Sequence, residues 1–284
     1  MEIARHPRYG RAVATAASDR RVGDLLREWR QRRRLSQLAL ALEAEVSARH
    51  ISFLETGRSV PSREMILHLA EQLQVPLRER NVLLLAAGFA PAFRERPLQD
   101  PALAGAREAV LLVLQAHEPY PALAIDRHWN LVAHNRAVAP FLDGVAPALL
   151  RPPVNVLRLS LHEEGLARRI ENAGEWRAHV LARLKRQVDV SADPVLAELH
   201  QELRDYPTSD PTESSAVRDR YAGVVVPLRL ATPAGVLTFI STTTVFGTPV
   251  DITLAELALE TFFPADATTA AALREQAARR EAGA

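Results

Sequence analysis

The sequence predicts two domains: an all-α domain of five helices, followed by an α+β domain with a five-stranded antiparallel sheet and flanking helices. Three observations support this prediction. The chain has 284 residues, which is enough for two domains. Its first third shows the 3.6-residue periodicity of helices, whereas strand-like alternation occurs only further along the chain. Between the two patterns, residues 91–102 are rich in proline and charge, as is typical of a linker.

The first domain is predicted to span residues 20–90, behind an arm of residues 1–19 that we expect to be flexible. Apolar residues recur in this domain at helical spacing, which predicts helices on both sides of a more irregular central stretch. These helices are expected at about residues 22–34, 62–73 and 77–87.

The central stretch, residues 36–62, is the most informative part of the chain. Ser36 and Ser47 each precede a short helical run and can accept a hydrogen bond from a free backbone N–H group. Ile51 and Leu54, three residues apart, give the second run a buried face. Two short helices joined by a tight turn are the pattern of a helix-turn-helix, whose second helix lies in the DNA major groove. The sequence therefore predicts double-stranded DNA as a partner.

The second helix of this motif presents side chains that suit contacts with DNA. The predicted base contacts are Ala48, Arg49, His50, Ser52 and Phe53. The predicted phosphate contacts are Gln37, Ser47, Thr56 and Arg58. For three of these residues another role stays open. Arg49 also suits a phosphate contact, His50 also suits a plain exposed position, and Phe53 can instead pack on a neighbouring helix.

This domain resembles the Cro/C1-type repressor domain of the XRE family over about residues 20–90, through its SQ start, the VS before the second helix and the run ISFLETGRSVPS. One position departs from the family pattern, because Glu45 stands in the turn where the family usually has glycine. A left-handed conformation at Glu45 costs about 1 kcal/mol, so we expect a turn that is either slightly strained or differently shaped. Gly57 suits a left-handed helix end.

Charge and composition exclude several classes of protein. Residues 1–96 carry 17 arginines and 11 acidic residues, a net charge of +6, whereas the remainder carries −5. Because DNA binding neutralises phosphates, only the first domain is expected to lie on DNA. The chain has no cysteine, which excludes disulfides and Cys-based metal sites. It has no apolar run long enough to cross a membrane and no secretory signal pattern, so we expect a cytoplasmic, nucleoid-associated protein.

The second domain, residues 103–284, is predicted to begin with a helix at 103–116. Two short strands follow on either side of a polar turn at 126–128, and Asn135 then suits the cap of a further helix. Residues 154–205 are helical by periodicity. Three later strands and a final Ala-rich helix are predicted at residues 223–232, 236–246, 254–263 and 268–281. The third of these strands also permits a helix.

Five strands, with helices inserted between the second and the third, resemble a PAS domain, an α+β sandwich of one sheet and its flanking helices. A closer resemblance follows from four blocks in order, EPYPALAIDRHWNLVAHNRA, VNVLRLSLHEEGLARRIENAGEWRAH, STTTVFGTPVDITLAEL and ETFFPAD. Together with the repressor-type head, they resemble the MmyB-like family of bacterial transcription regulators over about residues 20–275. The resemblance implies a DNA-binding head, a PAS-like ligand-binding domain and a lipid-like or fatty-acid-like ligand.

A sensory pocket is usually apolar with a few placed polar groups. The candidate pocket residues are Trp129, His134, Arg158, His162, Trp176, His179, Phe239 and Phe246. A histidine directly after a strand, such as His134, more often makes a structural hydrogen bond, and the two tryptophans suit the core as well as the pocket wall. His162 lies next to two glutamates but has no second histidine at i+4, so we expect no metal site, and no cofactor other than a bound apolar small molecule.

No motif of catalysis is present: the chain has no GxSxG, Walker loop, GxGxxG or HExxH. Glu163 and Glu164 would diverge by about 100° on a helix, so they cannot flank one bond. We therefore expect no enzyme but a sequence-specific transcriptional regulator, which binds operator DNA as a homodimer and carries a sensor domain for a small apolar ligand. In the alternative, the second domain is a ligand-free dimerisation or protein-interaction module.

Overall fold

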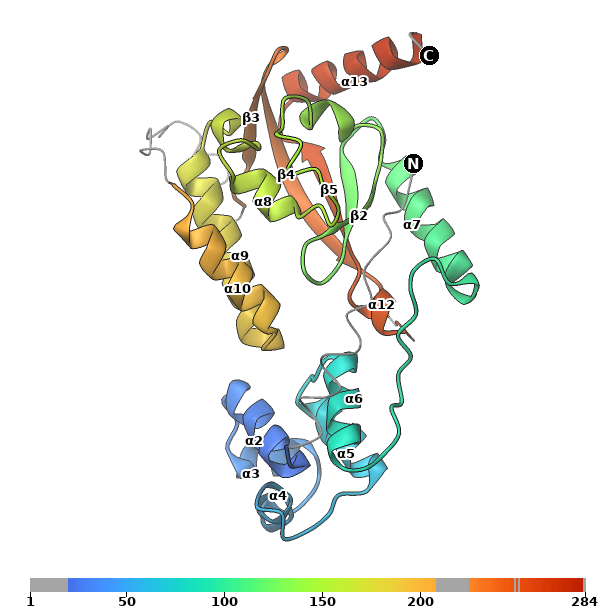
Figure 1. The fold of residues 1–284 in the computed structure, drawn as a ribbon, viewed down its shortest axis with the longest axis vertical. Helices are drawn as coiled ribbons and strands as arrows, with labels where there is room; N and C mark the ends of the chain where they lie inside the picture. Colours follow the sequence, from blue (N-terminus) through green and yellow to red (C-terminus); the bar gives the residue numbers. More distant parts are fainter. Residues whose placement is uncertain (1–19, 208–224, 248, 250, 283–284) are drawn as a thin grey trace.

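The computed structural model describes residues 20–207, 225–247, 249 and 251–282. Figure 1 shows them as a helical head and a larger α+β domain, connected by an extended segment. The predicted arm, residues 1–19, lies outside the described residues. None of the described helices is long and apolar enough to cross a membrane.

The described residues of the head form five helices, as predicted. They are α2 (Val22–Arg32), α3 (Gln37–Glu43), α4 (Ala48–Glu55), α5 (Arg63–Gln72) and α6 (Leu77–Ala86). The predicted caps are confirmed, because the hydroxyls of Ser36 and Ser47 accept hydrogen bonds from the third residue beyond each, at 3.0 and 3.1 Å. These caps fix where α3 and α4 begin and so define the turn between them.

The backbone of the head has the two left-handed positions that the sequence suggests. Glu45 has φ 53° in the turn between α3 and α4, and Gly57 has φ 73° after α4. A different glycine sets the packing of α4. A Cβ atom at Gly23 of α2 would lie 2.3 Å from the carbonyl oxygen of Leu54, so only glycine allows α2 to approach α4 this closely.

The strands of the second domain form one five-stranded antiparallel sheet, as predicted. They are β1 (Ala122–Ile125), β2 (Leu131–His134), β3 (Leu228–Thr232), β4 (Gly235–Val245) and β5 (Ala258–Pro264). The strand order is β2-β1-β5-β4-β3, so the last strand of the sequence pairs with both β1 and β4 in the middle of the sheet. The predicted strand at 254–263 begins later than expected, since its first residues belong to the short helix α12 (Ile252–Ala255).

Helices cover both faces of this sheet (Figure 1). The helix α7 (Ala104–Ala116), preceded by a 3-10 turn at Pro101–Leu103, packs on one face. On the other face lie α8 (Val156–Leu161), α9 (Ala173–Ser191) and α10 (Pro194–Asp205). Strand β1 contributes to both cores, because Ala122 and Ala124 face α7 whereas Ile125 faces the α9 side. The helix α13 (Ala267–Ala282) follows β5.

Two local predictions in the second domain are wrong. Asn135 does not cap a helix; its fully buried amide donates to the carbonyl oxygens of Leu114 and Tyr120, and its Oδ1 accepts from the backbone N–H of Ala122. The next helical turn is a 3-10 turn at Ala139–Phe141. The helical periodicity of 154–205 is also interrupted after α8, where the chain makes turns and one 3-10 segment, Ala167–Arg169, before α9 begins.

Candidate functional site

The outer surface of α4 carries a cluster of cationic and aromatic side chains. Figure 1 shows this helix at the end of the head that lies away from the second domain. The guanidinium groups of Arg49 and Arg58 lie 5.1 and 5.8 Å from the ring centroid of Phe53, and both arginines are exposed. Phe53 therefore packs against two arginines, and this cluster presents positive charge beside an apolar ring.

The other predicted DNA contacts surround this cluster. Thr56 and Ser47 are exposed, whereas the side chains of the remaining predicted base contacts, Ala48, His50 and Ser52, are half-buried. The Thr56 hydroxyl donates to the carbonyl oxygen of Ser52 at 2.7 Å, within α4 itself. The predicted base contacts thus all lie on one short helix. Three predicted phosphate contacts lie at its two ends, namely Ser47, Thr56 and Arg58.

A buried ion pair holds α4 against α2. Arg30 donates from Nε and Nη2 to the two carboxylate oxygens of Glu55, at 2.6 and 2.8 Å. The Glu55 side chain is 3% exposed, and its hydrogen bond raises the pKa of the Arg30 guanidinium. Gln37 also donates to Glu55, at 2.8 Å. The amide nitrogen of Gln37, predicted to reach a phosphate, therefore points into the head and helps to position α4.

A cavity of about 140 Å³ lies in the second domain between the sheet and α9. Its wall is mostly apolar and is formed by all five strands together with α8, α9 and the segment after β2. Four of the predicted pocket residues line it, namely Trp129, Trp176, His179 and Phe239. Further apolar lining residues include Leu123, Phe141, Leu157, Val180, Leu230 and Phe262.

The other four predicted pocket residues do not line this cavity. His134 lies with Nδ1 2.8 Å from the carbonyl oxygen of Asn135, and Arg158 makes two 2.7 Å hydrogen bonds to Glu202. His162 stacks edge-on against Tyr206, with ring centroids 5.2 Å apart. Phe246 packs on the opposite side of the sheet, in the core that α7 covers. Each of these side chains has a structural contact elsewhere.

The cavity wall includes an ion pair that sequence reasoning missed. Arg183 on α9 forms a salt bridge with Glu260 on β5, whose side chain is 5% exposed. Thr243 of β4 donates to the same carboxylate at 2.7 Å. The Arg183 guanidinium also lies over the ring of Trp129, 4.5 Å from its centroid. Arg183 stands seven residues after Trp176 on α9, and that helical spacing is the one signal that could have found it.

Hydrogen-bonding groups line the cavity beside this ion pair. Burial, and then the charge of Arg183, lower the pKa of His179, which favours the neutral form of its imidazole. His179 stacks on Trp176, whose indole nitrogen donates to the Ser160 hydroxyl at 2.8 Å. A neutral imidazole offers one donor and one acceptor. The cavity can therefore hold a mostly apolar molecule and hydrogen-bond a polar group on it. Among the described residues no three His, Asp or Glu side chains are grouped to hold a metal ion.

Comparison with protein families gives two matches. Residues 106–275 match the family model described as the MmyB-like transcription regulator ligand binding domain. Residues 21–83 match a model described as a helix-turn-helix domain. A search of curated proteins finds no match to the chain. The two matched segments correspond to the domain that contains the cavity and to the head that contains α4.

Proposed function

Because the chain belongs to the MmyB-like transcription regulators, we propose that it binds operator DNA through α4 and that a small, mostly apolar ligand in its cavity modulates this binding. The chain is a transcriptional regulator with a helix-turn-helix head and a ligand-binding domain. Both matched families are regulatory or binding domains rather than enzymes. A regulator of this kind acts on the nucleoid in the cytoplasm.

The DNA half of the proposal is supported by the cluster that Arg49 and Phe53 of α4 form with Arg58, which follows the helix. Arg49 lies in the first turn of the helix, the part that meets base edges when such a helix enters the major groove. Arg58 follows the helix and suits a phosphate contact. Operators of this class are read by dimers, so we propose a homodimer whose two α4 helices lie about 34 Å apart along the duplex.

The ligand half of the proposal depends on one observation, the apolar cavity of about 140 Å³ with a few polar groups, Arg183 among them, in its wall. An apolar cavity of about 150 Å³ in another protein binds a molecule of the size of benzene. The cavity therefore suits a ring-sized or short-chain group. A longer lipid-like ligand would need its wall to move.

The test begins with selection of operator sequences from random duplex DNA by the full-length protein. Arg49→Ala should weaken binding to the selected operator by about 1–3 kcal/mol and relax specificity at one base pair. Arg58→Ala should weaken all sequences alike. Arg279→Ala is the matched control, because Arg279 is an exposed arginine of α13 paired with Glu275. If no sequence is enriched, or if the control weakens binding as much as Arg49→Ala does, the DNA assignment fails.

The ligand assignment is tested by native mass spectrometry of the purified protein, followed by denaturing extraction. A stoichiometric small molecule would identify the ligand class. Bare protein at every oligomeric state would favour the alternative, a ligand-free dimerisation module. One observation favours that alternative: Leu112 and Val113 on α7 are 66% and 43% exposed, an apolar surface of the kind that subunits bury.

A further inference from the structure

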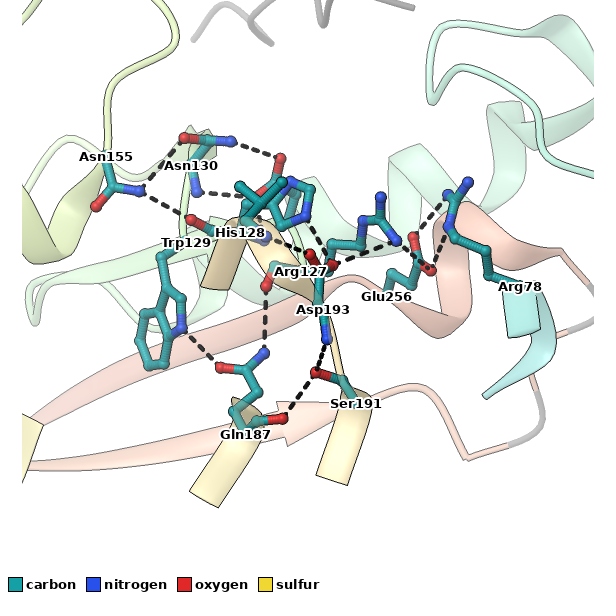
Figure 2. Close-up of polar contacts among 12 residues, drawn as sticks. Arg78, Arg127, His128, Trp129, Asn130, Asn155, Gln187, Ser191, Asp193 and Glu256 are labelled. Atoms are coloured by element: carbon teal, nitrogen blue, oxygen red, sulfur yellow. Dashed lines mark hydrogen bonds and ion pairs between the residues drawn. The ribbon is translucent and has the colours of Figure 1, made fainter. Parts of the chain in front are cut away.

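A network of charged side chains joins the head to the second domain (Figure 2). Arg78 on α6 of the head makes two hydrogen bonds to Glu256, which follows α12, both at 2.9 Å. The same guanidinium bonds both carboxylate oxygens of Glu95 in the linker, at 2.6 and 2.7 Å. The side chains of Arg78 and Glu256 are 11% and 19% exposed, so the contact between them is largely shielded from water, whereas the Glu95 side chain is 41% exposed. One arginine thus ties together the head, the linker and the second domain.

The backbone of the linker is also hydrogen-bonded to both domains. The Asn81 side chain on α6 accepts from the backbone N–H groups of Ala92 and Phe93, at 2.9 and 3.0 Å. On the other side, the N–H of Ile252 donates to the carbonyl oxygen of Arg94 at 2.9 Å. Because the linker is bonded on both sides, a displacement of α12 at Ile252 is passed to α6 and is not absorbed by a flexible linker.

The contacts of Arg78 with Glu95 and Glu256 are called the junction below. The turn of residues 126–130, between β1 and β2, faces this junction on one side and the cavity on the other. The Arg127 guanidinium lies 3.6 Å from a carboxylate oxygen of Glu256 and 3.6 Å from one of Asp193. His128 contacts the same Asp193 oxygen, with Nε2 at 2.9 Å. The next residue, Trp129, lines the cavity. Consecutive side chains of one turn thus reach two different sites.

This turn is held in a strained conformation by its own hydrogen bonds. Trp129 has φ 66°, in the left-handed region that bulky residues rarely adopt. The Asp126 carboxylate accepts from the backbone N–H groups of His128 and Asn130, and Asn155 donates to the carbonyl oxygen of His128. Strain of this kind persists only where surrounding contacts over-determine it, and it is common at switch regions. We therefore expect the turn to move as a unit.

Gln187 on α9 connects the two sides of the turn. Its Oε1 accepts the indole N–H of Trp129 at 2.7 Å, and its Nε2 donates to the carbonyl oxygen of Arg127 at 3.2 Å. Figure 2 shows this amide hydrogen-bonded to the Trp129 indole and to the backbone carbonyl of Arg127. Any displacement of the indole in the cavity therefore acts on the backbone that carries Arg127.

We infer that the turn of residues 126–130, with Gln187, transmits the state of the cavity to the DNA-binding head through Arg127, Glu256 and Arg78. The inference rests on the proposed function, since it names how the ligand domain would regulate the head. A ligand that displaces the Trp129 indole breaks its hydrogen bond to Gln187 and shifts Arg127. Arg127 then withdraws from Glu256, which changes how that carboxylate holds Arg78 and hence how α6 is seated. The turn is the two-state element that such coupling requires.

The inference is tested without a ligand, by cutting the link at the cavity wall. Trp129→Phe in the full-length protein keeps an aromatic ring but removes the indole N–H. Hydrogen exchange followed by mass spectrometry then reports on the junction amides of Ala92, Phe93 and Ile252, whose bonds tie the linker to both domains. We expect exchange there to become at least five-fold faster. Operator affinity, where an operator has been selected, should change at least five-fold as well.

Trp176→Phe is the matched control, because Trp176 lines the same cavity but donates its indole N–H to Ser160, away from the junction. It should leave junction exchange and operator affinity within two-fold of wild type. Gln187→Leu cuts the same link from α9 and should reproduce the Trp129→Phe effect, which covers the case in which Trp129→Phe fails to fold. In a Glu256→Gln background, Trp129→Phe should change junction exchange and operator affinity no further. A merely structural loss of stability would instead add to the effect of Glu256→Gln.

The outcomes separate this inference from the function on which it rests. Junction exchange that is unchanged by Trp129→Phe and by Gln187→Leu overturns the relay, even if operator binding is intact. Equal effects of Trp129→Phe and Trp176→Phe also overturn it, because the cavity as a whole would then be responsible. Failure to select any operator overturns the DNA assignment, whereas the exchange data still decide whether the turn is coupled to the junction.

Discussion

The buried pair of Arg30 and Glu55 allows a quantitative prediction about the head. Arg30→Met removes both hydrogen bonds to the Glu55 carboxylate and leaves that 3% exposed side chain with Gln37 as its remaining partner. Removing one member of a buried ion pair costs about 3–5 kcal/mol. Since about 1.4 kcal/mol corresponds to a factor of ten, the opening equilibrium of α2 and α4 should rise more than a hundredfold. Hydrogen exchange of residues 22–32 and 48–55 measures this opening separately from the second domain.

The expected loss arises from an unpaired buried carboxylate and not from lost packing volume. The double variant Arg30→Met with Glu55→Met should therefore recover most of the stability, because it removes both charges together. An exchange rate in the double variant that equals or exceeds that of Arg30→Met would refute the argument. So would a single-variant loss below about 1 kcal/mol, the range of an exposed pair.

Two further predictions concern packing and pH. Gly23→Ala should destabilise the head by about 1–3 kcal/mol in thermal unfolding, because its Cβ would meet the Leu54 carbonyl. Gly105→Ala on α7 is the control and should be neutral or stabilising, because a Cβ there would have no atom within 4 Å. The pKa of His179 is lowered in the folded protein from its ordinary value of 6.5. As the pH falls, His179 in the unfolded chain therefore binds a proton at a higher pH than it does in the folded protein. The free energy of unfolding should therefore decrease from pH 7.5 to 5.5 in urea titrations, and His179→Phe should reduce that decrease; an unchanged slope would contradict the assignment.

The features that could be predicted from sequence are those set by neighbours along the chain. The helices of the head follow from apolar periodicity and from the serine caps at Ser36 and Ser47, and both operate within one helical turn. The five strands follow from alternation and turn residues in the same way. Glu45 shows that even an unfavourable local residue is tolerated where the packing around the turn requires a left-handed backbone.

What the sequence could not provide depends on contacts between distant residues. Asn135 has a good local signal for a helix cap, but three backbone groups, from α7, β1 and the turn between them, use its amide instead. Arg183 and Glu260 are far apart in the chain, and so are Arg78 and Glu256, so each pair becomes visible only once the sheet and the two domains are placed. The close approach of Gly165 to α8 is also invisible in the sequence, since a Cβ atom there would lie 2.2 Å from the carbonyl oxygen of Leu159.

The central position of β5 has a consequence for synthesis of the protein. Without residues 258–264 the hairpin of β1 and β2 has no strand to join it to β3 and β4. The head, whose core comes entirely from residues before 90, can form on the ribosome long before that strand emerges. A premature stop codon upstream of β5 would then release the head without a folded ligand-binding domain. On the proposed function, that head would still occupy operators, so nonsense alleles of such a gene should compete with the intact regulator and not behave as simple nulls.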